Sequence, residues 1–155
     1  MEYKFKYDYF PDFHELPADE ILLIDEAFVA LQDAYAPYSE FKVGAAVKLK
    51  SGKIIRGNNQ ENIAYPSGLC AERVALFYAN ANYPGEEVEV VCITAKGDLI
   101  SKDMDLSPCG SCRQVILESE NRQTNPIKVI LINQNRSAIV LHSAKDLLPF
   151  GFCKK

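Results

Sequence analysis

The sequence lacks an excess of basic residues. Its 155 residues include 17 Lys and Arg against 21 Asp and Glu, a net charge of -4. This balance argues against a groove for a nucleic acid, because such binding depends on Lys and Arg that neutralise several phosphates. No run approaches the ~18 apolar residues that a membrane span needs. The first residues, MEYKFK, lack the apolar core of a secretion signal, so the expected compartment is the cytoplasm.

Disulfide bonds are not expected either. The five cysteines are an odd number, and in a reducing cytoplasm they favour free thiols or metal ligands. With 48 % apolar and 25 % charged residues, the composition is typical of one globular domain. A chain of this length buries enough surface to fold without cross-links.

The order of expected elements predicts an α/β fold. Helical spacing of apolar residues predicts helices at 17–36, 70–81, 109–119 and 143–148. Short apolar or alternating runs predict strands at 41–49, 53–56, 88–95, 127–133 and 138–142. We therefore expect a three-layer α/β/α sandwich, in which helices cover both faces of a mixed sheet of about five strands.

Residues 1–16 form an N-terminal extension ahead of the expected domain, which spans 17–155. In this extension aromatic residues alternate with charged ones, at Tyr3, Phe5, Tyr7 and Tyr9. Alternation of this kind is typical of a half-buried strand. We expect the extension to add a strand that covers a sheet edge or a neighbouring subunit.

Three cysteines share a local design that suits a metal ion. Cys70 and Cys109 each begin an expected helix, and Cys112 lies one turn beyond Cys109 on the same helix face. A helix N-terminus lowers the pKa of a thiol, and the thiolate is the form that binds metal. Thiolate ligands favour zinc, here one ion per chain. Three ligands leave the fourth tetrahedral position open, as in catalytic zinc sites.

Glu72 follows the first of these cysteines by two residues. It is close enough to accept a proton from a water molecule that the zinc activates. A CxxC pair by itself is as typical of a redox pair or of half a structural four-cysteine site, taken together, as of a catalytic zinc site. A fourth ligand from Cys92 or Cys153 would indicate a zinc-stabilised interaction module without activity. His14 and His142 stand in no ligand spacing.

Two motifs together, CAER at 70–73 and PCGSCRQ at 108–114, match the signature of zinc deaminases. In these two motifs the chain resembles the cytidine deaminases of the small, homotetrameric type. The similarity extends to YAPYS at 35–39, to RGNNQEN at 56–62 and to LLP at 147–149. It implies hydrolytic deamination of cytidine, 2′-deoxycytidine or both, by a zinc-bound hydroxide, in pyrimidine salvage. It also implies a nucleoside substrate and a homotetramer or homodimer.

The resemblance also assigns roles to individual residues. The zinc ligands and the proton carrier are Cys70, Cys109, Cys112 and Glu72. Asn59 and Glu61 match the pair that hydrogen-bonds the ribose 3′-hydroxyl, and Phe41 matches the aromatic residue that packs against the pyrimidine. Two aromatic residues reach the pocket from neighbouring subunits, and the matching positions are Tyr65 and either Phe152 or Phe150.

The charge of the expected zinc site predicts one further participant. Three thiolates around a dication leave a net charge of about -1, which weakens the zinc as a Lewis acid. Arg73 is suited to offset this charge by donating hydrogen bonds to the thiolates. Arg73 and the Asn59–Glu61 pair also favour a nucleoside deaminase over a deaminase of another small cytosine compound, such as one of the blasticidin type. Negative net charge disfavours a polynucleotide-editing deaminase.

Overall fold

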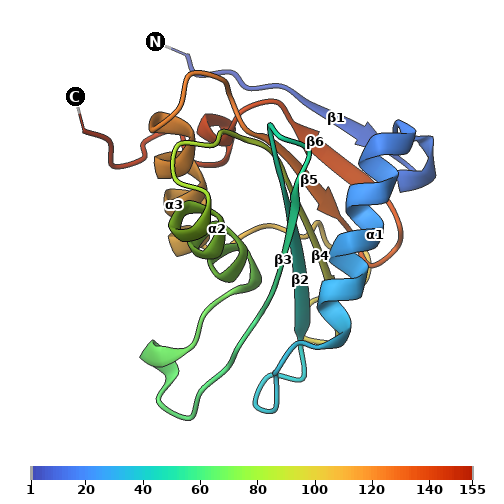
Figure 1. The fold of residues 1–155 in the computed structure, drawn as a ribbon. Coiled ribbons are helices and arrows are strands. Elements are labelled where there is room, and N and C mark those ends of the chain that lie inside the picture. The colour runs from blue at the N-terminus through green and yellow to red at the C-terminus, as the bar shows by residue number, and fades with distance from the viewer. Residues whose placement is uncertain (1, 155) are drawn as a thin grey trace.

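The protein forms a six-stranded sheet with helices on both faces, as the computed structural model of residues 2–154 shows (Figure 1). Met1, the first residue of the expected extension 1–16, and Lys155, the last residue of the expected domain 17–155, lie outside the described residues. The strands are β1 (Tyr7–Phe10), β2 (Lys42–Leu49), β3 (Ile54–Asn58), β4 (Val88–Lys96), β5 (Lys128–Ile132) and β6 (Ala138–Leu141). The α-helices are α1 (Ala18–Gln32), α2 (Ala71–Asn82) and α3 (Gly110–Asn121). Three short 3-10 helices are η1 (Phe13–Glu15), η2 (Tyr65–Ser67) and η3 (Ala144–Leu147).

The sheet has the strand order β1-β6-β5-β4-β2-β3. Strands β4 and β5 run parallel, with α3 as the connection between them, and the other neighbouring strands pair antiparallel. A parallel pair needs such a crossover, whereas the β2–β3 pair closes through a tight turn. Gly52 occupies that turn with a φ of 85°, a left-handed conformation that glycine adopts without strain. The expected mixed sheet is therefore confirmed.

Helices cover the two faces of the sheet unequally. Helix α1 packs on one face, and α2 and α3 lie side by side on the other (Figure 1). Each interface has its own buried apolar cluster, because alternate residues of the central strands point to opposite faces. On β4, for example, Val91 and Ile93 belong to the cluster under α2 and α3, whereas Cys92 belongs to the cluster under α1. The three-layer α/β/α prediction is confirmed.

Strand β1 raises the strand number from the expected five to six. It pairs antiparallel with β6, with Tyr7 opposite Leu141 and Phe10 opposite Ala138. Phe10 packs on the cluster under α1, while Tyr7 and Tyr9 remain more than half exposed on the other face. The strand begins at Tyr7, four residues later than the start of the aromatic alternation. The N-terminal segment therefore covers the edge of β6.

Two expected helices are shorter in the structure. Helix α1 ends at Gln32 instead of continuing to residue 36. Beyond it, the Tyr35 backbone pairs with the segment at Asn59 to Glu61 through hydrogen bonds of 3.0 and 2.9 Å. This long-range pairing takes up the backbone groups that another helical turn would use. The last expected helix, 143–148, is the 3-10 turn η3.

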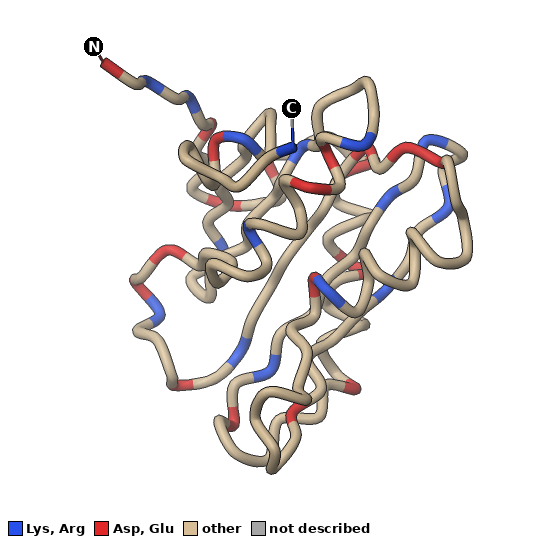
Figure 2. Tube along the Cα trace, turned by 90° about the vertical axis from the view of Figure 1, so that its left-hand side faces the viewer, with Lys and Arg blue, Asp and Glu red and all other residues tan. Residues whose placement is uncertain are grey.

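Charged residues of both signs are interspersed along the described chain (Figure 2). Lys48, for instance, lies 3.6 Å from both Asp19 and Glu89. The charge of this lysine is therefore compensated by two acidic neighbours. Over residues 2–154, no helix combines the length and the apolar character that a membrane crossing requires.

Candidate active site

The starts of helices α2 and α3 bring three cysteines together. Cys70 is the N-cap of α2 and Cys109 is the N-cap of α3, both with extended backbone angles, and Cys112 lies in the first turn of α3. Their sulfur atoms all lie within 4.8 Å of one another. The Cys70–Cys109 distance is 3.8 Å and the Cys109–Cys112 distance is 3.5 Å. The site depends on the side-by-side packing of the two helices, which join segments 39 residues apart in the chain.

The spacing of these sulfur atoms fits a zinc ion. With Zn–S bonds of ~2.3 Å, tetrahedral geometry requires S–S distances of roughly 3.8 Å. Cys112 is buried, Cys70 is partly buried and Cys109 is exposed, so the cluster reaches the surface on one side. Cys92 is completely buried in the cluster under α1, and Cys153 accepts a hydrogen bond from Asn121 at 3.2 Å. Neither belongs to the three-sulfur cluster found in the described part of the chain.

Arg73 contributes a positive charge beside the sulfur atoms. Its Nη2 lies 3.8 Å from the Cys70 sulfur, at the limit of a hydrogen bond to sulfur. Its buried Nε has no hydrogen-bond partner in the structure. Hydrogen bonding to the Cys112 thiol, and then to Arg73, lowers the pKa of Cys70 to about 5. This environment favours the thiolate form that binds metal.

Glu72 is the carboxyl group closest in sequence to this cluster. It lies in the first turn of α2 and is only 3 % exposed. Burial raises the pKa of Glu72 to about 7. Its buried Oε2 has no hydrogen-bond partner in the structure, and such orphaned atoms are rare in native proteins. A buried carboxyl group with one unpartnered oxygen and a pKa near neutrality suits a group that exchanges protons with water or a ligand.

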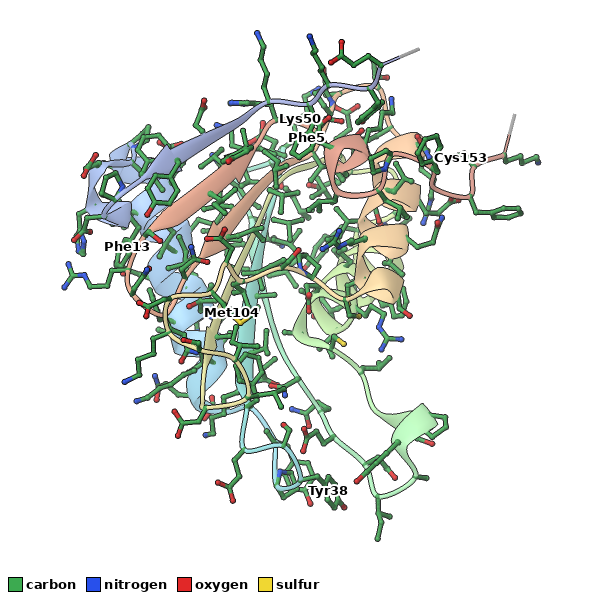
Figure 3. All side chains as sticks on the ribbon, turned by 180° about the vertical axis from the view of Figure 1, so that it is seen from behind. Phe5, Phe13, Tyr38, Lys50, Met104 and Cys153 are labelled. Carbon is green, nitrogen blue, oxygen red and sulfur yellow. The ribbon has the colours of Figure 1, made fainter. Side chains whose placement is uncertain are left out.

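A cavity of about 430 Å³ opens beside Cys70 and Arg73. Its remaining lining comes from two loops, one between α1 and β2 and one between β3 and α2. They contribute Tyr38, Ser39, Asn59, Gln60, Glu61, Asn62, Tyr65, Gly68 and Leu69. Within the loop between β3 and α2, the Gln60 backbone exchanges two hydrogen bonds with Leu69, of 2.9 and 3.0 Å. Tyr38, in the loop between α1 and β2, lies at the end of the molecule away from β1 (Figure 3). Its ring meets that of Tyr65 edge-on, with centroids 5.9 Å apart.

The structure brings half of the sequence-predicted site residues to this cavity. These are Asn59, Glu61, Tyr65, Cys70 and Arg73. Phe41 is half-buried and packs against the core under α2 and α3. Phe152 is 87 % exposed and lies by a separate hollow on α2 and α3, where its backbone is hydrogen-bonded to Gln114. Phe150 is 93 % exposed, so neither ring enters this chain's own cavity.

Glu61 and Asn59 are both fixed by the loop that leads into β2. The Glu61 carboxylate accepts hydrogen bonds from the amides of Tyr38 at 2.8 Å and Ser39 at 3.2 Å, and from the Ser39 hydroxyl. Partial burial acts to raise the pKa of Glu61, but these hydrogen bonds outweigh it and leave the pKa below its ordinary value. Asn59 accepts from the Val43 amide at 2.8 Å and donates to the Phe41 carbonyl at 2.9 Å.

Ser39 is a site residue that the sequence analysis missed. It belongs to the YAPYS segment, but no role was assigned to its hydroxyl. A local signal was present, because a serine side chain often forms a hydrogen bond with the backbone two residues further along, here with the Phe41 amide. The partner across the loops, Glu61, lies 22 residues away and could be found only from the structure.

Comparison with known proteins places these features in a family. Residues 18–126 match the family described as "Cytidine and deoxycytidylate deaminase zinc-binding region". A cytidine deaminase of Halalkalibacterium halodurans is 46 % identical over 134 residues, which cover 86 % of this chain and 94 % of that protein. A probable cytidine deaminase of Dictyostelium discoideum is 37 % identical over 132 residues, 85 % of this chain and 82 % of that protein.

Solved structures give the same result. The crystal structure of cytidine deaminase from Burkholderia pseudomallei superposes with a TM-score of 0.74 at 40 % identity, over 85 % of this chain and 98 % of that one. The enzyme from Mycobacterium tuberculosis superposes with a TM-score of 0.67 at 29 % identity, over 89 % of this chain and 100 % of that one. With its three-cysteine zinc site, the chain belongs to the cytidine and deoxycytidylate deaminase family.

Proposed function

We propose that the chain catalyses the hydrolytic deamination of cytidine, 2′-deoxycytidine or both, which yields uridine or 2′-deoxyuridine and ammonia. The observation that carries this proposal is the position of Glu72. Its buried carboxyl group lies in the first turn of the helix that Cys70 caps, and that cysteine belongs both to the sulfur cluster and to the lining of the cavity. A proton carrier, a metal site and a substrate cavity therefore meet at one helix start.

The residues of the cluster divide the chemistry between them. Cys70, Cys109 and Cys112 would hold the zinc ion, which when bound supplies Lewis-acid activation of a water molecule. Glu72 accepts a proton from this water and delivers one to N3 of the cytosine ring as the water oxygen bonds to C4. Glu72 then carries the second proton to the amino group on C4. The C4–N bond breaks, ammonia leaves and the C4 carbonyl of the uracil ring remains.

The cavity residues would bind the nucleoside. Glu61 lines the cavity as an acceptor, which suits the ribose 3′-hydroxyl. Asn59 uses one of its two amide N–H groups on the Phe41 carbonyl, so the other is free to donate. Phe41 would pack against the pyrimidine ring. Tyr65 and Phe152 would complete the pockets of neighbouring subunits, and the exposure of both rings, 73 % and 87 %, is compatible with that role.

We propose a homotetramer, with a homodimer as the alternative. Exposed aromatic residues on α2, among them Phe77 and Tyr78 at 46 % and 53 % exposure, support an interface on the α2 and α3 face. Sedimentation velocity of the purified protein distinguishes these states from a monomer. Residues 17–155 would form one deaminase domain, with 1–16 as its N-terminal extension, and a domain that depends on three reduced thiols fits the cytoplasm.

The test is a comparison of Glu72→Gln with the unaltered chain. Each protein is assayed for zinc content and for the ultraviolet change that accompanies conversion of cytidine to uridine. We expect Glu72→Gln to keep one zinc per chain and to lose turnover by ~10²-fold or more, since general acid–base groups contribute about that much. Glu118→Gln, an exposed carboxyl on α3, is the matched control and keeps normal turnover.

Two results contradict the proposal. Near-normal turnover by Glu72→Gln removes this residue from the mechanism. Absence of cytidine deamination by the zinc-loaded, unaltered chain removes the nucleoside substrate, and a parallel assay on a blasticidin-type compound then tests the other cytosine substrates.

A further inference from the structure

The hydroxyl group of Ser39 joins the cavity wall to the segment that leads into β2. Its Oγ donates a hydrogen bond to Oε1 of Glu61 and accepts one from the Phe41 amide at 3.1 Å. Phe41 directly precedes β2, whereas Glu61 lies in the loop after β3. One small side chain therefore ties the aromatic residue proposed for the pyrimidine to the carboxylate proposed for the ribose.

The hydrogen bonds of Ser39 fix the direction of its hydroxyl proton. A serine hydroxyl has one donor and two acceptor positions. Because the Phe41 amide occupies an acceptor position, the single O–H is directed to Glu61. The carboxylate in turn has about four acceptor positions, and three are taken by the Tyr38 amide, the Ser39 amide and the Ser39 hydroxyl. About one position is left for a donor in the cavity.

Asn59 fixes the other side of the same strand start. Its side chain accepts from the Val43 amide and donates to the Phe41 carbonyl. The Phe41 backbone is thus held at its N–H by Ser39 and at its C=O by Asn59. This double attachment means that a change at Ser39 leaves the strand start anchored through Asn59, while the Glu61 carboxylate loses its donor at Oε1.

We infer that Ser39 is a positioning residue, whose hydroxyl orients the Glu61 carboxylate to accept a hydrogen bond from the ribose 3′-hydroxyl and so sets the preference for nucleosides that carry it. This inference rests on the proposed nucleoside deamination. Ser39 acts through Glu61, and its hydrogen bonds go to Glu61 and Phe41, so its effect falls on substrate binding and not on the chemical step.

The test compares substrates with and without the 3′-hydroxyl. For Ser39→Ala we expect KM for cytidine to rise by about tenfold or more, the size of effect that hydrogen bonds to charged groups produce, with kcat nearly unchanged. The substrate 2′-deoxycytidine keeps the 3′-hydroxyl and should show the same rise. With 3′-deoxycytidine, which has no 3′-hydroxyl, Ser39→Ala should differ little from the unaltered chain. Ser39→Thr keeps a hydroxyl and should restore the cytidine KM.

Ser51→Ala is the matched control. Ser51 donates a hydrogen bond to Glu86 at 2.6 Å in the turn after β2, outside the cavity lining, so its loss should leave all three substrates unaffected. If Ser39→Ala does not fold, Ser39→Cys gives the same comparison, because a thiol is a weaker donor than a hydroxyl.

Three outcomes overturn the inference. An equal loss of kcat/KM on cytidine and 3′-deoxycytidine shows that Ser39 only supports the loop. An unchanged KM for cytidine in Ser39→Ala shows that Glu61 does not need the hydroxyl. Absence of cytidine turnover by the unaltered chain is distinct from both, since it refutes the proposed function itself and the inference with it.

Discussion

Gly57 determines how closely helix α2 approaches the sheet. A Cβ atom on this residue of β3 would lie 2.5 Å from the Ala71 carbonyl oxygen and 2.6 Å from the Ala75 amide nitrogen. Both obstacles are backbone atoms, which cannot rotate away as a side chain can. Ala71 stands between Cys70 and Glu72, so the residue that Gly57→Ala displaces is part of the helix start that carries the site.

The size of the displacement follows from these distances. Non-bonded heavy atoms are most stable at roughly 3.5 Å or more, so α2 has to retreat by about 1 Å. Overpacking of this kind costs about 1–3 kcal/mol of stability. Metal sites tolerate changes of ~0.2 Å in ligand distances. A 1 Å shift of Cys70 away from the cysteines of α3 should therefore weaken zinc binding by about tenfold or more, as other changes around zinc ligands do.

Gly44→Ala supplies the control on the opposite face. A Cβ there would lie 2.1 Å from the Ala27 carbonyl oxygen and 2.7 Å from the Leu31 amide nitrogen, so it displaces α1. Zinc affinity is measured by competition with a chromogenic chelator, and circular dichroism gives the folded fraction to which it is normalised. We expect both variants to lose stability but only Gly57→Ala to lose zinc affinity. Unchanged zinc affinity in Gly57→Ala, or an equal loss in both, would refute the reasoning.

Three further predictions concern single charged residues. Arg73→Ala should lower zinc affinity or kcat by about tenfold, because a positive neighbour of the Cys70 thiolate is lost. Chelator competition measures the affinity and steady-state kinetics measure kcat. If neither changes, Arg73 does not offset the negative charge of the thiolates. Glu120 is 4 % exposed and accepts from the Ile127 and Ala144 amides at 2.8 and 2.7 Å. Glu120→Gln should therefore cost about 2–4 kcal/mol in urea unfolding, and a cost below ~1 kcal/mol would contradict this. Glu87 stays ionised down to low pH. Hydrogen bonds from the Asn125 side chain, the Thr124 amide and Lys50 lower the pKa of Glu87 from 4.5 to about 2.

The lowered pKa of Glu87 gives a defined pH window. Stabilisation by its ionised form is complete above the unfolded pKa of 4.5 and is lost as the pH falls from about 4.5 to about 2. Thermal unfolding at a series of pH values should show Glu87→Gln losing less stability than the unaltered chain across that window. Parallel curves for the two proteins would exclude Glu87 as a contributor.

Much of the fold was predictable from local pattern. The apolar spacing of α2 and the β-branched run of β4 gave element bounds within one or two residues, because both elements bury a face that their sequence marks clearly. The end of α1 was not predictable. Helical residues continue past Gln32, but Tyr35 pairs with a loop that follows two strands later. Long-range pairing of this kind overrides local propensity and leaves no local signal.

The candidate active site was likewise predictable only in part from the sequence. Each motif of the sequence is short and local: a cysteine at a helix start, a carboxylate in the same turn and a pair of cysteines at another helix start. The chemistry that zinc requires of its ligands makes these motifs readable without a structure, and the family they predicted is confirmed.

By itself, the sequence determined the family and the three-layer architecture, and it supplied the zinc-binding cysteines as a hypothesis. These depend on residue types at fixed local spacing. Only the tertiary structure decided that the Cys70 and Cys109 sulfur atoms lie 3.8 Å apart, that one oxygen of Glu72 is buried without a partner and that Ser39 reaches Glu61. The Cys70–Cys109 and Ser39–Glu61 contacts join residues from different elements, and these features depend on how closely the helices and loops pack.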